Sequence, residues 1–439
     1  MALRSSAAIM AGALVALAVW PSAKIGQAPE ASFTPAPVMR DYMLRDRFVA
    51  FYEHELRRDP RDQIKMRMLA QQYLQRFREQ FDLNDIARAE RLAERSIELQ
   101  PQGNTPAQMA LAGALLNYHD FREALQHEYA ALRGEPSNAA VQAQIASLEM
   151  ELGRYERAKQ MLDGIADKRR DYPSVDAVRA RYQELTGALD AARTTIARAE
   201  RTMDGGIDNP AYDRSWFHMR SGQLAFEAGD FDTARAEFEE SLQLFPDNAV
   251  ALMWQARMYR GRKEWRNALA AAAKSANLYP LPQTLGYEAD AQRALGDAEG
   301  AARTDALIGA EQRLFNFQGI NDRLLANYYA QRRLHLDEAL KAARNDYHKR
   351  GDEVYADDTM GWVLAAMGQW NHARVYTERA VRSGTRDPEV QYHAAVVAIH
   401  NGCAAEAKRR LSDALRQNPW FDPFEADDAR RQLARLNAR

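Results

Sequence analysis

Residues 229–234 read Gly-Asp-Phe-Asp-Thr-Ala, a turn residue followed by an aromatic after two positions and an alanine after five. The phrase returns at 119–124 (HDFREA), 153–158 (GRYERA) and 368–373 (GQWNHA). The closing alanine can be followed along the chain at Ala89, Ala124, Ala158, Ala192, Ala234, Ala268, Ala301, Ala339, Ala373 and Ala407. Successive spacings are 35, 34, 34, 42, 34, 33, 38, 34 and 34 residues, so six of the nine are 34 or 35. A fixed period in this range is typical of repeat architectures and decides the fold.

The period and its residues resemble the tetratricopeptide repeat, a helix–turn–helix unit of 34 residues. In residues 215–248, Gly222 stands where the first helix needs a small residue, Gly229 marks the turn, Ala234 opens the second helix and Pro246 ends it. Proline ends a helix because it lacks an amide hydrogen and clashes with the preceding turn. The resemblance implies an all-α fold, a right-handed α-solenoid of about ten helix–turn–helix units with helical caps, in which neighbouring units bury each other's apolar faces.

The N-terminus has the order of a secretory signal. Arg4 precedes an uncharged run of 14 residues, 7–20, which is short for a membrane span but suits a signal peptide. Ala23 is the expected last residue of the signal, with Ala28 as a competing site and an uncleaved anchor as the alternative. We therefore expect a periplasmic or secreted protein.

The domain organisation follows from the repeat. We expect a signal peptide at 1–23, a Pro- and Ala-rich linker at 24–38, an N-terminal helical cap at 39–69, ten repeats at 70–421 and a C-terminal capping helix at 422–439. Breaks in the period at 205–214 and 316–319 are interpreted as longer loops. No later stretch of the sequence is apolar enough to span a membrane.

Composition and motifs argue against several function classes. The net charge of −2 lacks the basic excess of a nucleic-acid binder, and the single cysteine, Cys403, excludes internal disulfides. Nucleotide-binding, zinc-protease and serine-hydrolase motifs are missing from the sequence, so we expect no enzyme, cofactor or metal. His393 and His400 share a helix face without an acidic residue between them, and Asp357-Asp358 reads as a helix start.

The concave surface is the candidate binding site. In tetratricopeptide proteins, positions 2, 5, 9 and 12 of the first helix usually line the inner groove, and aromatic, Met and Arg residues are enriched where proteins bind one another. Arg257, Arg260 and Arg293 come from adjoining units and suit an acidic peptide, although packing or solvent exposure remains the alternative for each. The Lys and Asn residues of the family's carboxylate clamp are not matched. The mapped groove comprises Arg181, Trp216, Met219, Phe226, Met253, Arg257, Arg260, Arg293, Tyr328, Tyr355, Trp362 and Tyr392.

The repeats without catalytic motifs predict a non-enzymatic scaffold that binds a protein or peptide in its groove. The alternative is a polysaccharide- or envelope-binding component of an export or cell-wall machinery, in which Trp216, Trp362, Tyr355 and Tyr392 stack on sugars. The chain also resembles exported bacterial tetratricopeptide proteins of no settled role, which implies a compartment and not a mechanism. That resemblance is carried by Phe51-Tyr52-Glu53, Asp59-Pro60, residues 73–76, 88–90 and 355–362, and 418–430.

Overall fold

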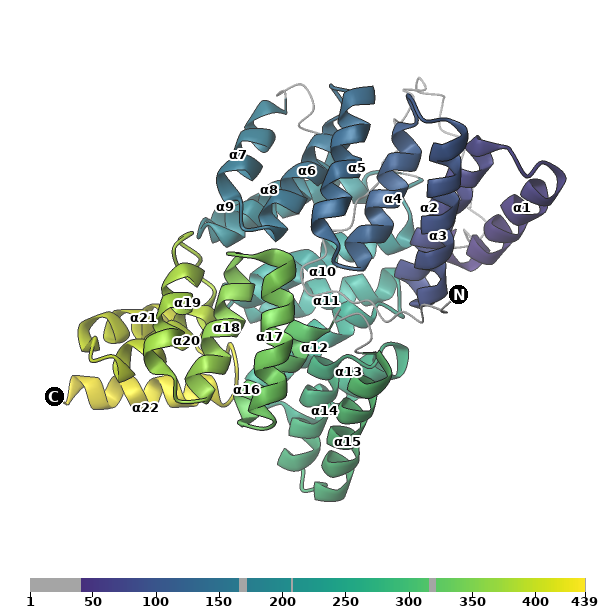
Figure 1. Cartoon of the computed structure of the whole chain (residues 1–439). Coiled ribbons are helices and arrows are strands. Elements are labelled where there is room, and N and C mark those ends of the chain that lie inside the picture. The colour runs from purple at the N-terminus through teal and green to yellow at the C-terminus, as the bar shows by residue number, and fades with distance from the viewer. Residues whose placement is uncertain (1–40, 166–171, 207, 316–320, 439) are drawn as a thin grey trace.

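The computed structural model describes residues 41–165, 172–206, 208–315 and 321–438. These residues form 22 α-helices and one short 3-10 helix, with no strand among them (Figure 1). The predicted signal peptide, the linker and the break at 316–319 lie outside the described residues. None of the described helices is both long enough and apolar enough to cross a membrane.

The helices follow one another as antiparallel pairs, which confirms the all-α solenoid that the period predicts. Ten pairs run from α2 to α21 within the described residues. Their bounds are Gln63–Gln80 and Leu83–Leu99 (α2, α3), Thr105–Asn117 and Phe121–Gly134 (α4, α5), Ala139–Glu151 and Tyr155–Gly164 (α6, α7), Pro173–Leu185 and Leu189–Asp204 (α8, α9), Ala211–Glu227 and Phe231–Leu244 (α10, α11), Ala249–Gly261 and Trp265–Leu278 (α12, α13), Pro282–Ala294 and Ala298–Phe315 (α14, α15), Asp322–Arg332 and Leu336–Arg350 (α16, α17), Val354–Ala366 and Trp370–Ala380 (α18, α19), Pro388–His400 and Ala404–Gln417 (α20, α21).

Small side chains hold each pair together. All ten closing alanines lie near the start of the second helix of a pair, and each is at most 1% exposed. A methyl group at this position lets the two backbones approach closely. Gly222 on α10 serves the same purpose, because a Cβ there would overlap the ring of Phe238 on α11. The spacing of the alanines therefore reports the core contact of every pair.

The array is extended at both ends. The 3-10 helix η1 (Asp41–Leu44) and α1 (Arg45–Arg58) precede the first pair, and residue 70, the predicted start of the repeats, lies inside α2. α22 (Glu425–Asn437) follows the last pair. Its first turn carries Glu425, Asp427 and Asp428 and its last turn Arg435, the charge order that suits the helix dipole.

The superhelix is wound tightly enough for its late pairs to pack against its early pairs (Figure 1). Turns inside the early pairs meet the loops that join the late pairs. We call this contact the seam. Four hydrogen bonds mark it, namely Lys349 Nζ to Tyr118 O at 3.4 Å, Val354 N to Tyr155 Oη at 3.0 Å, Ser383 Oγ to Leu185 O at 2.8 Å and Asn418 Nδ2 to Phe226 O at 2.7 Å.

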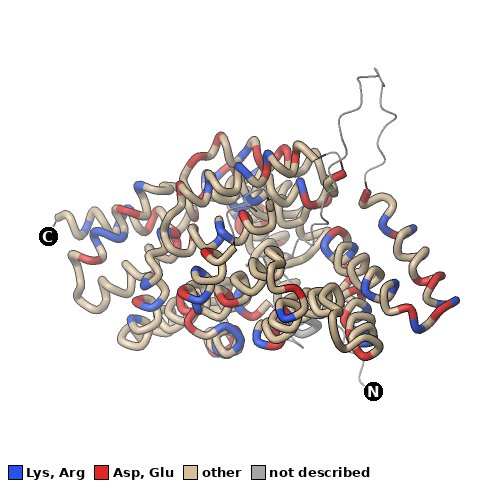
Figure 2. The backbone as a smooth tube through the Cα atoms, turned by 90° about the horizontal axis from the view of Figure 1, so that it is seen from above, with Lys and Arg blue, Asp and Glu red and all other residues tan. Residues whose placement is uncertain are grey.

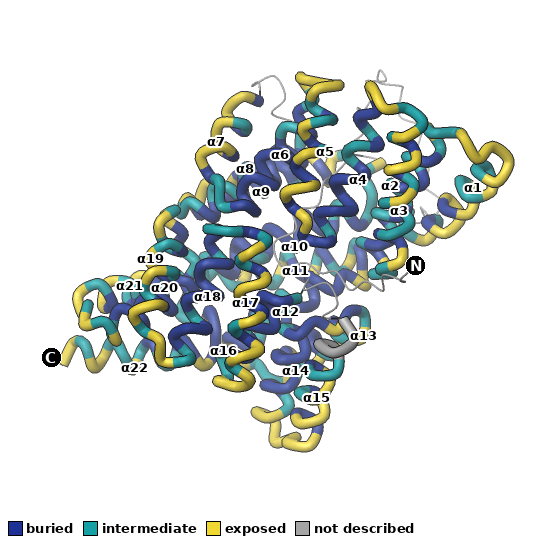
Figure 3. Tube along the Cα trace, in the orientation of Figure 1, coloured by how far each residue is buried: buried dark blue, intermediate teal, exposed yellow. Residues whose placement is uncertain are grey.

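Closing the seam encloses the inner surface. Figure 3 shows buried residues concentrated in the interior helices such as α10, α12, α14 and α18, and exposed residues at outer tips such as that of α15. The groove that an open solenoid presents to solvent is therefore divided here into cavities.

Candidate functional site

Side chains from both sides of the seam enclose a cavity of about 180 Å³, which we call the central cavity. One wall comes from α8, α10, α12 and α14, and the other from α16, α18 and α20. Its lining includes Arg181, Trp216, Met219, Arg220, Glu227, Met253, Trp254, Arg257, Arg323, Asn327, Tyr355 and Asp387.

The predicted groove residues divide among three cavities. Six of the twelve line the central cavity, namely Arg181, Trp216, Met219, Met253, Arg257 and Tyr355. Arg293, Trp362 and Tyr392 line a second cavity of about 610 Å³ near the C-terminal helix, which we call the C-terminal cavity. Tyr328 lines a small cavity of about 60 Å³ that also touches Arg257 and Trp362.

Phe226 and Arg260 line none of these cavities. Each is 1% exposed, because the loop between α21 and α22 covers this part of the inner surface. Arg260 forms buried ion pairs with Asp290, at 2.7 Å, and with Asp422. Arg260 is thus a packing residue of the C-terminal cap, and its charge is offset within the chain.

The other arginines of the predicted groove are also paired internally. Arg181 contacts Glu184 at 2.7 Å, and Arg257 contacts Glu389 at 2.5 Å. Arg293 pairs with Asp305. Lys, Arg, Asp and Glu residues are interspersed along the whole chain (Figure 2). The expectation that these arginines await the carboxylates of a partner therefore has to be weighed against the acids that already occupy them.

Two carboxylates of the central cavity have no such partner. Neither Glu227 nor Asp387 forms an ion pair with a Lys or Arg among the described residues. Gln223 donates to Glu227 at 3.0 Å, and Asp387 accepts from two amides at the start of α20. Burial, followed by the charges of Glu184 and Asp387, raises the pKa of Glu227 above its ordinary value. The cavity therefore offers an uncompensated acidic site beside aromatic rings.

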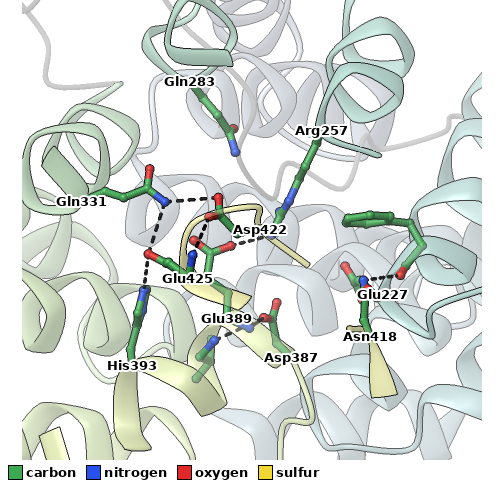
Figure 4. A network of polar contacts seen from close by, with 12 residues as sticks. Glu227, Arg257, Gln283, Gln331, Asp387, Glu389, His393, Asn418, Asp422 and Glu425 are labelled. Atoms are coloured by element: carbon green, nitrogen blue, oxygen red, sulfur yellow. Dashed lines mark hydrogen bonds and ion pairs between the residues drawn. The ribbon is translucent and has the colours of Figure 1, made fainter. Parts of the chain in front are cut away.

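A buried polar network lies between the central and C-terminal cavities (Figure 4). Gln331 donates to Asp422 at 3.3 Å and to Glu425 at 3.2 Å. His393 contacts Asp358 through Nδ1 at 3.0 Å and Glu425 through Nε2 at 3.4 Å. Burial lowers the pKa of His393, but the facing carboxylates of Asp358 and Glu425 outweigh it and leave that pKa raised.

The sequence alone singles out His393 with His400, but the structure separates them. His400 stacks on Trp370 with ring centroids 3.6 Å apart, whereas His393 faces Glu389 and Glu425. Glu389 precedes His393 by four residues, a helical spacing that could have been recognised. Glu425 comes from another helix, and only the folded chain brings it to His393.

Comparisons with known proteins agree with this architecture. Residues 118–182 match the family model described as tetratricopeptide repeat. The chain is 26% identical over 250 residues to cellulose synthase operon protein C of Xanthomonas axonopodis pv. citri (strain 306). That alignment covers 51% of this chain and 16% of the relative, so the chain matches about a sixth of the length of that protein.

Similar solved structures share the helical solenoid. Yeast Tom70 has a TM-score of 0.32 at 12% identity and covers 86% of this chain and 97% of its own. PilW, a type IV pilus biogenesis factor, has a TM-score of 0.40 at 18% identity and covers 50% of this chain and 98% of its own. The family match over residues 118–182, continued by helix pairs of the same construction, makes this chain a tetratricopeptide-repeat protein.

Proposed function

We propose that this protein is a non-enzymatic scaffold, exported to the periplasm or cell surface, that binds a segment of a partner protein in the central cavity. The observation that carries the proposal is the lining of that cavity. Residues from seven helices on both sides of the seam place Trp216, Met219, Met253 and Tyr355 around one space. Aromatic and Met side chains are the types that anchor protein partners.

The charges of the central cavity favour a basic anchor on that partner. Its four arginines and their neighbours Glu184 and Glu353 are joined by ion pairs with Glu389, and Glu227 and Asp387 are left over. A Lys or Arg side chain entering the cavity would offset these two carboxylates. Aromatic faces such as those of Trp216 and Tyr355 also attract cations. We therefore expect a partner segment that inserts a basic side chain.

The test is capture of the partner by variants of one residue. The full chain is used as bait with the native envelope fraction, beside Glu227→Gln and the control Glu299→Gln, whose side chain is 92% exposed on α15. Neutralising a buried, unpaired carboxylate keeps the side-chain shape and does not weaken the fold. We expect a protein captured by the wild type and by Glu299→Gln and lost by Glu227→Gln. Equal capture by all three baits would refute the cavity as the binding site.

The pH dependence of capture gives a second readout. The pKa of Glu227 is raised by burial, so its carboxyl gains a proton more readily than an exposed one. A basic ligand binds the ionised form, and affinity should therefore rise between pH 6 and pH 8.5. A binding curve that falls over this range would contradict a basic anchor.

Export is tested separately by analysis of the N-terminus. A periplasmic chain that begins at Lys24 would support the predicted signal peptide, and a chain in the membrane fraction that keeps residues 1–23 would indicate an uncleaved anchor. A cytoplasmic chain that keeps residues 1–23 would contradict export.

Polysaccharide binding is the second candidate, and the C-terminal cavity favours it. Trp362, Trp370, Tyr392 and Phe424 line that space, and sugars bind on aromatic faces. The similarity to cellulose synthase operon protein C suggests cello-oligosaccharides as the probe. Saturable binding by calorimetry that is lost in Trp370→Ala would support this function, and no heat of binding would exclude it for this class of sugar.

A further inference from the structure

Three potential metal ligands converge in the buried polar network. Glu389 and His393 lie one turn apart on α20, and Glu425 is the first residue of α22. One carboxylate oxygen of each Glu and one ring nitrogen of His393 lie within 4.8 Å of one another. Figure 4 shows the three side chains approaching one another between the two helices.

The imidazole of His393 is held in the orientation that a metal ligand needs. Its Nδ1 lies 3.0 Å from both carboxylate oxygens of Asp358 on α18. A carboxylate on one ring nitrogen fixes the tautomer and directs the other nitrogen to the ion, as is usual for metal-binding histidines. Nε2 is then left with only a long contact of 3.4 Å to Glu425.

Glu425 supplies an independent sign of a missing ligand. Its side chain is 5% exposed, and its Oε2 atom has no hydrogen-bond partner among the described residues. An unpaired buried carboxylate oxygen is costly, because it has lost its water without gaining another donor. Gln331 and His393 both contact the other oxygen, Oε1. Glu389 is engaged by Arg257 at Oε2, so its Oε1 is also available to a ligand.

Space and charge both suit a divalent ion. The three residues line the small cavity of about 60 Å³, enough for an ion with a bound water. Glu389, Glu425, Asp358 and Asp422 bring four negative charges, which are offset only by Arg257 and Arg260. The neighbouring Asp290 has Arg332 as a further partner at 2.7 Å. A divalent ion beside a neutral imidazole would make this group neutral.

We propose that Glu389, His393 Nε2 and Glu425 bind a divalent transition-metal ion, with Asp358 as the supporting carboxylate. One imidazole nitrogen with carboxylate oxygens suits zinc and similar ions, whereas calcium and magnesium prefer oxygen ligands alone. The bound ion would join α20 to α22 and fix the C-terminal helix over the inner surface. This site does not depend on the proposed function of the central cavity.

Zinc titration of the full chain, stripped with EDTA, tests this inference. We expect one zinc ion per chain by calorimetry and a higher melting temperature with zinc, since a ligand that binds the folded state stabilises it. His393→Gln should weaken binding at least about 100-fold, and Asp358→Asn about tenfold. His400→Gln removes a histidine of the same helix outside the cluster and should leave the affinity unchanged within about twofold.

The alternative arrangement is an imidazolium held between Asp358 and Glu425 without a metal. It predicts no saturable zinc binding by the wild type, which would overturn the proposal. Binding that is lost in His218→Gln and kept in His393→Gln would overturn it too, because it would place the ion at Glu200, His218 and Glu237, another group of potential ligands. Circular dichroism checks folding, and if His393→Gln unfolds, Glu425→Gln and X-ray absorption of the zinc-loaded wild type decide.

Discussion

Glu128 on α5 is a single side chain that opposes folding at neutral pH. It is fully buried, and neither of its carboxylate oxygens has a hydrogen-bond partner among the described residues. Burial raises the pKa of Glu128 well above its ordinary value. The folded state therefore binds this proton more tightly than the unfolded state, and stability falls as the pH rises above the unfolded pKa.

Replacing Glu128 by Met should raise the free energy of unfolding by about 1–3 kcal/mol at pH 8, the cost of an unsatisfied buried polar group. The gain should be smaller at pH 4, where the carboxyl is protonated in both states. Urea unfolding at the two pH values measures the difference. Glu123→Met, an exposed position on the same helix, is the control and should change stability by less than about 0.5 kcal/mol. A gain that is equal at both pH values would contradict the assignment.

Between helices, Arg350 at the end of α17 is the strongest polar link across the seam. It is 2% exposed and pairs with Asp346 at 2.9 Å and with Glu151, the last residue of α6. Its guanidinium also lies 4.5 Å from the ring centroid of Phe121 at the start of α5. Arg350 therefore joins two helices of the early pairs to one of the late pairs.

Arg350→Ala leaves two buried carboxylates without a cation, so we expect a loss of about 3–5 kcal/mol in urea unfolding. Arg374→Ala is the matched control, because its pair with Glu378 on α19 is largely exposed and such pairs contribute little. Similar effects of the two substitutions would show that the Arg350 link does not hold the seam.

The helix pairs were predictable from sequence because each is built from local contacts that repeat. Ala234 and Gly222 are small for a reason that lies within one unit, so their spacing reveals the unit. Phe226 and Arg260 show where this reasoning ends. Both occupy inner-groove positions of the repeat, but Asn418 and Asp422, from the loop before α22, cover them. The period carries no information on a contact between residues 192 or 162 positions apart.

The chain closes on itself, and its turn glycines make the closure possible. Gly187 has a φ of +83°, and a Cβ there would overlap the carbonyl oxygen of Gly384 in the late half. Gly368 stands at the equivalent turn of α18 and α19 with a φ of +76°, and nothing lies within 4 Å of its Cβ position. The two glycines share the backbone requirement and differ only in the seam.

Gly368→Ala should therefore cost about 1 kcal/mol through the positive φ alone. Gly187→Ala adds a clash between backbones across the seam and should open the superhelix. Small-angle scattering is expected to give a larger radius of gyration for Gly187→Ala than for Gly368→Ala, with equal helix content by circular dichroism. Equal radii for the two variants would mean that the seam tolerates the added methyl group.

The central claim is that the cavity enclosed by the seam receives a partner protein. The most direct measurement is photocrosslinking in cells with p-benzoylphenylalanine at Asn327, which lines the central cavity, and at Leu307, which is 54% exposed on α15. We predict a protein adduct from position 327 that disappears in Glu227→Gln, and no adduct from position 307. Adducts from position 307 with none from position 327 would contradict the account and place binding on the outer surface.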